Sequence, residues 1–444
     1  MKELLPTLLN HALPSKVVVK PDVLLPRLFS DNTIFGGVGR AHHGLCIEKF
    51  LEHCEEKDIL TSSQTSSGHR NCWLSCPDLT VASQEASFAS FLNRLSNEVQ
   101  DYATCLIKRV WSADFKEHSM PGVGSSNRPD IVCADVHKPI DCRNIRTILE
   151  LKSGSNMTPN EIFRSCVQRA RLIFSTQDTR RFVVVLLLHQ YKLTVAFFDR
   201  GGSIVFQPFD ICAHPDLFAR VVLAFVCADL TGLGYATSLS DEPRIDRLLL
   251  FHGLQLQIRF TAFISDYMHG RGTVIWLGKV GKISDLSEVR QQANLKVDQP
   301  VVIKTSWVDD ASVLTEGTVL ALLAQKGVQG VPTLIYEDFV PPPFTDDGAS
   351  SDGTAYTRAK LGLSVGDDND GCGAISLSKE ATKAIQVMAV GPHVEGFAPR
   401  TPVRMVTKPW ATPLTQFRSA RELLGIFVDV LNGELYFEYL LTVL

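Results

Sequence analysis

The chain has 444 residues with a net charge of −4, and 45% of its residues are apolar while 21% are charged. This composition predicts a globular protein of two or three domains with sizeable cores, and it argues against a largely disordered chain. The acidic balance excludes a globally basic nucleic-acid-binding protein, although a local basic face stays compatible with these totals.

We expect neither a signal peptide nor a transmembrane helix. The N-terminus lacks the long apolar core of a signal peptide, and no run of about 18 uncharged apolar residues occurs. Eleven cysteines are scattered along the chain, and only Cys72 and Cys76 lie close together. We interpret the cysteines as reduced thiols of an intracellular protein, in the cytoplasm or nucleus, with no membrane contact and no metal site.

Residues 1–82 are expected to be a mainly helical and loop region. Prolines at positions 6, 14, 21 and 26 interrupt the early helical patterns. Residues 42–56 have the pattern of a short amphipathic helix, and residues 61–69 are a Ser, Thr and Gly-rich loop. From residue 83 to 109, apolar residues recur at helical spacing and predict a long helix.

Residues 83–235 are predicted to form an α/β domain. After the long helix, the patterns indicate strands at 129–135 and 145–152, a helix at 160–174, a β-meander at 182–189, 193–199 and 204–209, and a helix at 217–230. Residues 199–202 predict a hairpin turn. A polar connector at 231–246 contains glycines and a proline, and we place the domain boundary there.

Residues 247–444 are predicted to form a second, strand-rich domain. A helix at 316–326 interrupts its strands, and further strands are expected at 331–338 and 402–406. Residues 341–380 contain few apolar residues and many Asp, Gly and Ser, which predicts a disordered insertion. Residues 417–444 have the pattern of an apolar helical stretch.

The most informative stretch of the second domain is a glycine-containing hairpin that precedes a strand with a lysine. Gly270, Arg271 and Gly272 lie between two predicted strands, Lys304 lies in the next strand, and Glu316 follows on the helix. Glycines let backbone N–H groups approach phosphate oxygens, because no Cβ blocks the approach. A lysine can bind the α- and β-phosphates while a helix glutamate holds the lysine. These five residues are our predicted nucleotide-binding site.

Two features weaken this prediction. Ile275 stands where a third glycine of a glycine-rich loop would lie, and a surface hairpin with an exposed lysine explains the same residues. Because side chains alternate along a strand, we also expect the Lys304 ammonium to lie on the face opposite the packed Val302 side chain.

Further segments with the same order and spacing carry a family resemblance. They are Arg128-Pro-Asp130, Leu149-Glu-Leu-Lys152, Phe198-Asp-Arg-Gly201, Gly270-Arg-Gly-Thr273, Val301-Val-Ile-Lys-Thr-Ser-Trp307, Glu316-Gly317, Gly327-Val-Gln-Gly-Val331 and Phe417-Arg-Ser-Ala-Arg-Glu-Leu-Leu424. Together they resemble the fungal-type protein kinase family from roughly residue 85 to the C-terminus. The resemblance implies a protein-kinase-like fold that uses ATP and Mg²⁺, with a small lobe and the start of a large lobe in residues 247–444.

The sequence lacks the motifs that perform phosphoryl transfer in protein kinases. Neither His-Arg-Asp nor Asp-Phe-Gly occurs in the 444 residues, and these motifs supply the catalytic aspartate and a magnesium ligand. The stretch from 421 to 439 resembles the helix that precedes the catalytic loop in the family. We therefore expect a truncated, catalytically incompetent member, either a natural pseudokinase or an early stop or wrong gene model. Its apolar C-terminal helix would then suit a scaffold that binds a protein partner.

A second set of residues indicates a different chemistry. Asp130, preceded by a proline, and the later Glu150-Leu-Lys152 fit the PD-(D/E)xK nuclease pattern. In that pattern two carboxylates hold Mg²⁺, and the lysine positions the attacking water. Glu150 and Lys152 point to one face of a strand, and Glu98 or Gln168 on flanking helices would complete the site. The alternative is an ion pair on a half-exposed sheet.

The combined expectation is an α+β protein. A nuclease-like α/β domain precedes a kinase-like small lobe, and kinase-family membership with little or no activity is the leading function. A Mg²⁺-dependent nuclease or nucleic-acid-binding module is the first alternative, and a scaffold is the second.

Overall fold

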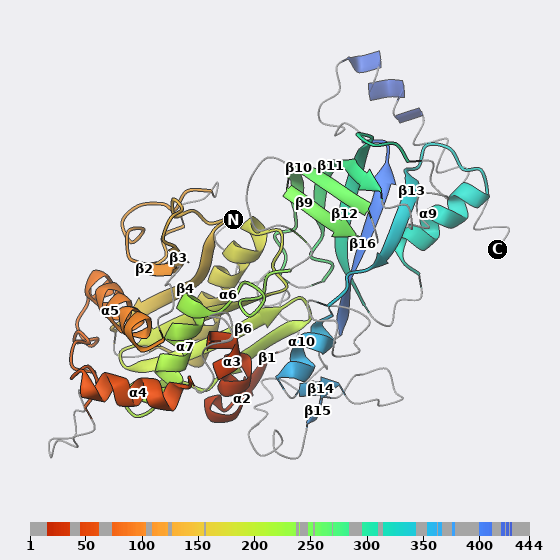
Figure 1. Cartoon of the computed structure of the whole chain (residues 1–444). Coiled ribbons are helices and arrows are strands. Elements are labelled where there is room, and N and C mark those ends of the chain that lie inside the picture. The colour runs from red at the N-terminus through yellow and green to blue at the C-terminus, as the bar shows by residue number, and fades with distance from the viewer. Residues whose placement is uncertain are drawn as a thin grey trace. The chain divides into compact units, whose positions relative to one another are not determined.

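A computed structural model of the chain shows two units of mixed helix and sheet (Figure 1). It describes residues 16–35, 45–61, 73–103, 109–122, 127–154, 157–236, 239, 247–251, 254–268, 270–283, 295–309, 314–342, 353–361, 363–365, 375–377, 399–410, 419–421, 423–425 and 427–428. Most of the predicted helix at 417–444 lies outside the described residues, as does Cys72. The eight described cysteines are free thiols. None of the described helices combines the length and the apolar character that a bilayer-spanning helix needs.

The two units interleave along the chain. The first consists of residues 1–237, 265–272 and 353–400, and the second of residues 238–264, 273–352 and 401–444. The first division lies within the expected connector. The sequence pattern placed the turn at 265–272 and the segment at 353–400 in the second domain, whereas their contacts group them with the first unit.

The first unit is built on one large mixed sheet. Its strand order is β1 (Lys16–Val19), β7 (Gly202–Phe206), β6 (Lys192–Asp199), β5 (Phe182–His189), β4 (Ile145–Lys152), β3 (Ile131–Asp135) and β2 (Arg109–Ser112), and β8 (Phe209–Asp210) pairs with β6. The three strands β2, β3 and β4 are antiparallel, β4 runs parallel to β5, and β5, β6 and β7 form the expected meander.

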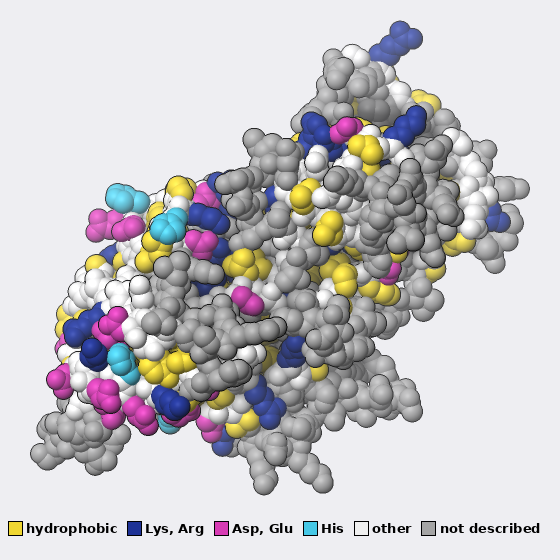
Figure 2. Space-filling view, in the orientation of Figure 1, with side chains coloured by type: hydrophobic (Ala, Val, Ile, Leu, Met, Phe, Trp, Pro, Cys, Tyr) yellow, Lys and Arg dark blue, Asp and Glu magenta, His cyan; other side chains and the backbone are white. Residues whose placement is uncertain are grey.

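Helices cover the sheet of the first unit. They are α2 (Pro21–Leu28), α3 (Asp31–Phe35), α4 (Ile47–Glu56), α5 (Glu85–Ala103), α6 (Pro159–Thr176), α7 (Pro215–Cys227) and α10 (Thr354–Lys360), and a small hairpin joins β14 (Leu363–Val365) to β15 (Ile375–Leu377). Acidic and basic side chains lie intermixed on the described surface around α4 and α5 (Figure 2).

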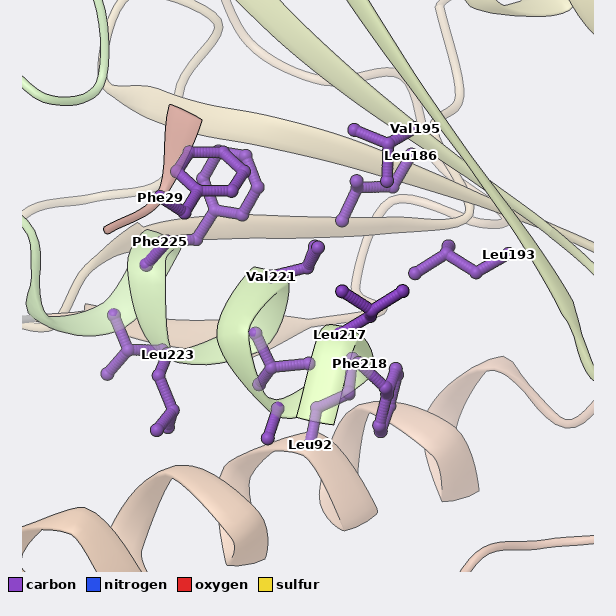
Figure 3. Close-up of a cluster of buried hydrophobic side chains, with 14 of the residues drawn as sticks. Phe29, Leu92, Leu186, Leu193, Val195, Leu217, Phe218, Val221, Leu223 and Phe225 are labelled. Atoms are coloured by element: carbon purple, nitrogen blue, oxygen red, sulfur yellow. The ribbon is translucent and has the colours of Figure 1, made fainter. Parts of the chain in front are cut away.

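Two separate apolar cores form because the side chains of a strand alternate between the faces of the sheet. On β5, Val184 and Leu186 belong to the larger core with α5 and α7, whereas Val183 and Val185 belong to the core with α6. Strands buried on both faces are nearly continuous apolar runs, as β5 is. Figure 3 shows the larger core, in which the side chains of α7 fill the space around the helix. Phe218 of α7 is 1% exposed.

The start of α6 is fixed by local sequence. Thr158 is the N-cap and accepts a hydrogen bond from the Glu161 N–H, while the Glu161 carboxylate accepts one from the Thr158 N–H. This reciprocal arrangement is a capping box. Pro159 follows the N-cap, and its fixed φ suits the first helical turn. The crossover helix between the parallel strands β4 and β5 therefore begins at Pro159, one residue before the predicted start.

Three parts of the first unit differ from the sequence-based expectation. The region 1–82 is not separate, because β1 pairs in parallel with β7 and its helices join the larger core. β2 forms at residues expected to end a helix and begin a loop, since it extends the antiparallel ladder on β3. The expected disorder at 341–380 is wrong for α10, because Arg358 and Thr354 are buried. Much of the remaining segment lies outside the described residues.

The second unit contains a six-stranded sheet and helix α9, and its described residues between 420 and 428 are also helical. The strand order is β13 (Thr333–Phe339), β16 (Arg400–Lys408), β12 (Pro300–Asp309), β11 (Val274–Ile283), β10 (Leu254–Ile264) and β9 (Arg247–Phe251), and α9 (Glu316–Gln325) follows β12 in the chain. Buried side chains from all six strands form its core, including Trp276 and Ile303. Arg404 of β16 lies over Phe251 and donates a hydrogen bond to the Thr305 hydroxyl at 3.1 Å.

Candidate functional site

Lys304 lies in the middle of β12 on the less buried face of the sheet. Val301 and Ile303 are fully buried, whereas Val302 and Lys304 are half-buried. Our expectation that Lys304 faces away from Val302 is wrong, because a period of two puts residues 302 and 304 on the same face. The lysine therefore projects from the face opposite the apolar core.

The Lys304 ammonium is paired with the glutamate predicted for it. Lys304 Nζ and Glu316 Oε2 are 2.5 Å apart, and their side chains are 22% and 40% exposed. Glu316 is the first residue of α9, where the positive end of the helix dipole favours a carboxylate. Thr315 caps the helix by accepting the Thr318 N–H at 3.2 Å. The strand and the helix thus bring together two of the five predicted nucleotide-binding residues.

The remaining three predicted residues lie in the turn between β10 and β11. Ile275, three residues after Gly272, is the register partner of Lys304 across β11 and β12. Gly270 and Gly272 both have left-handed backbones, with φ of +84° and +43°. The side chain of Arg271 is exposed. This turn is grouped with the first unit, whereas Lys304 and Glu316 belong to the second.

Gly272 has a packing partner that the sequence did not indicate. A Cβ at Gly272 would lie 2.5 Å from Nε of Arg200, which sits in the β6–β7 turn of the first unit. Arg200 donates hydrogen bonds to the carbonyls of Tyr267 and Met268 at 2.7 and 3.3 Å. Burial lowers the pKa of Arg200 to about 10, against the opposing effect of Asp199. The absence of a side chain at Gly272 is therefore explained by close packing on a buried guanidinium.

The two glycines are expected to respond differently to alanine. Gly270→Ala has open space for its Cβ and incurs only the left-handed strain, on the order of 1 kcal/mol. Gly272→Ala has the same strain and must also displace Arg200, so we expect roughly 2–3 kcal/mol. Urea unfolding of both variants measures the difference. Equal losses of stability would contradict the packing of Gly272 on Arg200.

A four-residue charged cluster occupies the first unit where the nuclease pattern predicted a site. Asp130 Oδ2 accepts the Leu151 N–H at 2.9 Å and lies 3.0 Å from Lys152 Nζ. Lys152 Nζ also lies 3.2 Å from Glu150 Oε2, and Arg169 Nε lies 2.7 Å from Glu150 Oε1. β3 and β4 bring the two acids together because Ile131 and Leu149 are register partners.

The helix residues that complete this cluster differ from those expected. Gln168 of α6 has an exposed side chain, and its neighbour Arg169 pairs with Glu150 instead. Glu98 of α5 lies 3.6 Å from His53. Adjacent residues of a helix point about 100° apart, so of Gln168 and Arg169 only Arg169 faces the sheet.

The charges of the cluster balance one another. Burial lowers the pKa of Lys152, but the charges of Glu150 and Asp130 and their hydrogen bonds raise it more, so its net pKa is raised. The two carboxylates are therefore matched by two cations. Among the described residues no group of three or more His, Cys, Asp or Glu side chains is arranged to hold a metal ion. Two carboxylates still suit Mg²⁺, which retains several waters and uses substrate phosphate as further ligands.

Two further charged residues make contacts that the sequence pattern did not indicate. Glu337 of β13 accepts the Gly317 N–H at 2.8 Å and the Thr315 hydroxyl, so it contacts the start of α9. Asp199 at the end of β6 accepts both Nε and Nη2 of Arg358 of α10, at 2.8 and 2.6 Å. The partners of Glu337 and Asp199 lie 20 and 159 residues away in the chain. Local sequence patterns therefore did not reveal these contacts.

Comparison with known proteins places the chain in a family. The family described as fungal protein kinase matches residues 126–438, which is more than half of the chain. No curated protein and no solved structure matches the chain. The match spans the paired Lys304 and Glu316 and the glycine turn before them. The chain belongs to the fungal protein kinase family.

Proposed function

We propose that the second unit binds a nucleoside triphosphate through Lys304 and Glu316, and that these 444 residues do not themselves transfer its phosphate. The observation that carries the proposal is the 2.5 Å pair between a lysine in the central part of the sheet and a glutamate that begins the next helix. In protein kinases a lysine–glutamate pair of this kind must be in place for ATP to be held productively. Because the chain belongs to the fungal protein kinase family, we assign the same role to the Lys304–Glu316 pair.

Each residue has a defined part in the proposed binding. The Lys304 ammonium donates hydrogen bonds to phosphate oxygens, and the Glu316 carboxylate holds the lysine side chain in one orientation. Mg²⁺ would neutralise phosphate charge when bound, but the sequence contains neither His-Arg-Asp nor Asp-Phe-Gly. We therefore assign no metal ligand for phosphoryl transfer.

Calorimetric titration with ATP and Mg²⁺ tests the binding. We expect a weak dissociation constant, on the order of 100 μM, for the wild-type chain. Lys304→Met should weaken it at least about tenfold, because the phosphate loses its cation. Lys279→Met is the matched control, since Lys279 lies in the same sheet but pairs with Asp298 at 2.5 Å. Equal affinities for the wild type and Lys304→Met would refute the proposal.

A radiolabel assay tests the absence of phosphoryl transfer. We expect no incorporation of γ-phosphate into a peptide or into the chain itself, because no residue is assigned to orient the acceptor hydroxyl. Incorporation by the wild type that disappears in Lys304→Met would show that these residues suffice for transfer.

A second candidate function rests on the charged cluster alone, since the comparisons do not support it. Lys152 Nζ lies 3.0 Å from Asp130 and 3.2 Å from Glu150, so the two carboxylates a Mg²⁺-dependent phosphodiesterase would use flank one lysine. Asp130 and Glu150 would hold Mg²⁺, which polarises the phosphodiester, and Lys152 would hold the attacking water. Arg169 must release Glu150 for that arrangement to form, or bind the substrate phosphate itself.

Plasmid nicking in the presence of Mg²⁺ tests this second function. We expect Glu150→Gln to abolish cleavage, since a neutral amide binds Mg²⁺ poorly. Asp101→Asn, which changes an exposed carboxylate on α5, should leave cleavage unchanged. The same amount of nicking by the wild type and Glu150→Gln would exclude the site.

A further inference from the structure

The start of α9 is bound from two strands of the same sheet. Lys304 of β12 binds Glu316, the first residue of the helix, at 2.5 Å. Glu337 of β13 accepts the Gly317 N–H at 2.8 Å and the hydroxyl of the N-cap Thr315. β16 lies between β12 and β13, so the two strands are about 10 Å apart.

The carboxylate of Glu337 also determines which residue fits at position 317. A Cβ on Gly317 would lie 2.5 Å from both Cδ and Oε2 of Glu337. Gly317 is buried at the beginning of a helix, where an alanine would otherwise be favoured by about 1 kcal/mol. The glycine therefore lets the Glu337 carboxylate reach the backbone of the first turn.

We infer that Glu337 is the positioning residue for the Lys304–Glu316 pair. A carboxylate at a helix N-terminus satisfies backbone N–H groups that have no partner within the helix, and the helix dipole strengthens the bond. By fixing the first turn of α9, Glu337 places the Glu316 side chain against Lys304. Glu337 itself needs no contact with nucleotide, and its effect on binding passes through the pair. This inference rests on the proposed nucleotide site for its functional meaning.

The geometry of the pair can be measured without nucleotide, from the reaction of Lys304 with a dilute amine-acylating reagent followed by peptide mass spectrometry. An ion-paired ammonium reacts slowly, so Glu316→Gln should raise the rate at Lys304 about two- to fivefold. Glu337→Ala should raise it by a similar factor. In the Glu316→Gln background, Glu337→Ala should add nothing. Lys279, paired with Asp298 in the same unit, is the internal control.

Three matched variants separate positioning from general loss of structure. Glu337→Gln keeps an oxygen acceptor for the Gly317 N–H and should leave Lys304 close to its wild-type reactivity. Asp338→Ala removes the neighbouring carboxylate of β13, which bonds the Tyr336 hydroxyl, and should have no effect on Lys304. Gly317→Ala should raise the Lys304 rate in the wild type but much less in Glu337→Ala, where the clash is relieved.

The result expected is therefore a specific rise at Lys304 in Glu337→Ala and Gly317→Ala, with Lys279 unchanged. Unchanged Lys304 reactivity in Glu337→Ala would overturn the inference, even in a protein that binds ATP. A rise at Lys304 in a protein that shows no calorimetric ATP binding would support the positioning role and refute the proposed function. A rise at both lysines would indicate general unfolding and overturn the specific role.

Discussion

Asp199→Asn is expected to lower the free energy of unfolding of the first unit by about 3–5 kcal/mol. Asp199 and Arg358 are 2% and 4% exposed, and the carboxylate accepts two hydrogen bonds from the guanidinium. The substitution keeps the shape of the side chain and an acceptor for the Gly201 N–H, which Asp199 bonds at 2.8 Å. It removes the negative charge and replaces Oδ2, which accepts from Arg358 Nε, with an NH₂ donor, so the buried Arg358 cation loses the charge of Asp199 and one hydrogen bond. Urea-dependent hydrogen exchange of the β6 amides measures the change in the first unit.

The control for this prediction is a surface pair of the same type. Asp298→Asn breaks a pair with Lys279 in which the aspartate side chain is 68% exposed, so we expect a loss below about 1 kcal/mol. In a double-mutant cycle with Arg358→Met, the loss should be smaller than the sum of the single losses by at least about 1 kcal/mol. Additive losses would mean that Asp199 and Arg358 do not stabilise one another.

Phe218→Ala is expected to cost about 3–5 kcal/mol, as typical of a large aromatic removed from a packed core. Phe218 of α7 is 1% exposed, and its ring stacks on Phe91 with centroids 6.2 Å apart and lies edge-on to Trp73 at 5.5 Å. The position is visible in Figure 3, between α7 and its neighbouring elements. The substitution loses both the burial of the ring and the contacts of its neighbours, because a rigid helix cannot close the cavity. Urea-dependent hydrogen exchange of the β5 and β6 amides measures the loss of unfolding free energy.

Leu74→Ala is the matched control for the aromatic. Leu74 is 54% exposed, so its truncation should change stability by no more than about 0.5 kcal/mol. A loss of less than 1 kcal/mol in Phe218→Ala would contradict a core organised around α7 in the first unit.

Much of the fold was predictable because its patterns are local. The apolar run at 182–189 and the strand pattern after it predict β5 and β6, and the helical spacing of apolar residues at 160–174 predicts α6. The strand with Lys304 and the helix with Glu316 were predicted from residue type and order alone, and the structure pairs them. The ion pair of Lys152 with Asp130 and Glu150, which the sequence offered as the alternative to a nuclease site, is present in the structure.

The remainder depended on contacts between distant segments. β1 is a strand because it adds to the edge of β7, and nothing near residue 16 indicates that partner. α10 is ordered because Arg358 pairs with Asp199, 159 residues earlier in the chain. The polar sequence around α10 does not reveal this pair and therefore suggested disorder. Arg169 was missed in favour of Gln168, since a helix of polar residues does not reveal which of two neighbours faces a sheet. In the sequence Glu337 has the pattern of an ordinary charged strand residue, and only its contact with the start of α9 reveals its role.

Covalent mapping with an adenosine analogue carrying a sulfonyl fluoride tests the nucleotide site most directly. Its sulfonyl group forms a sulfonamide with a neighbouring lysine amine and releases fluoride. The account predicts that Lys304 is the modified residue, that excess ATP prevents the modification, and that Lys279 in the same sheet is not modified. Modification of other lysines at equal rates, or modification of Lys304 that ATP does not reduce, would contradict a nucleotide site at the Lys304–Glu316 pair.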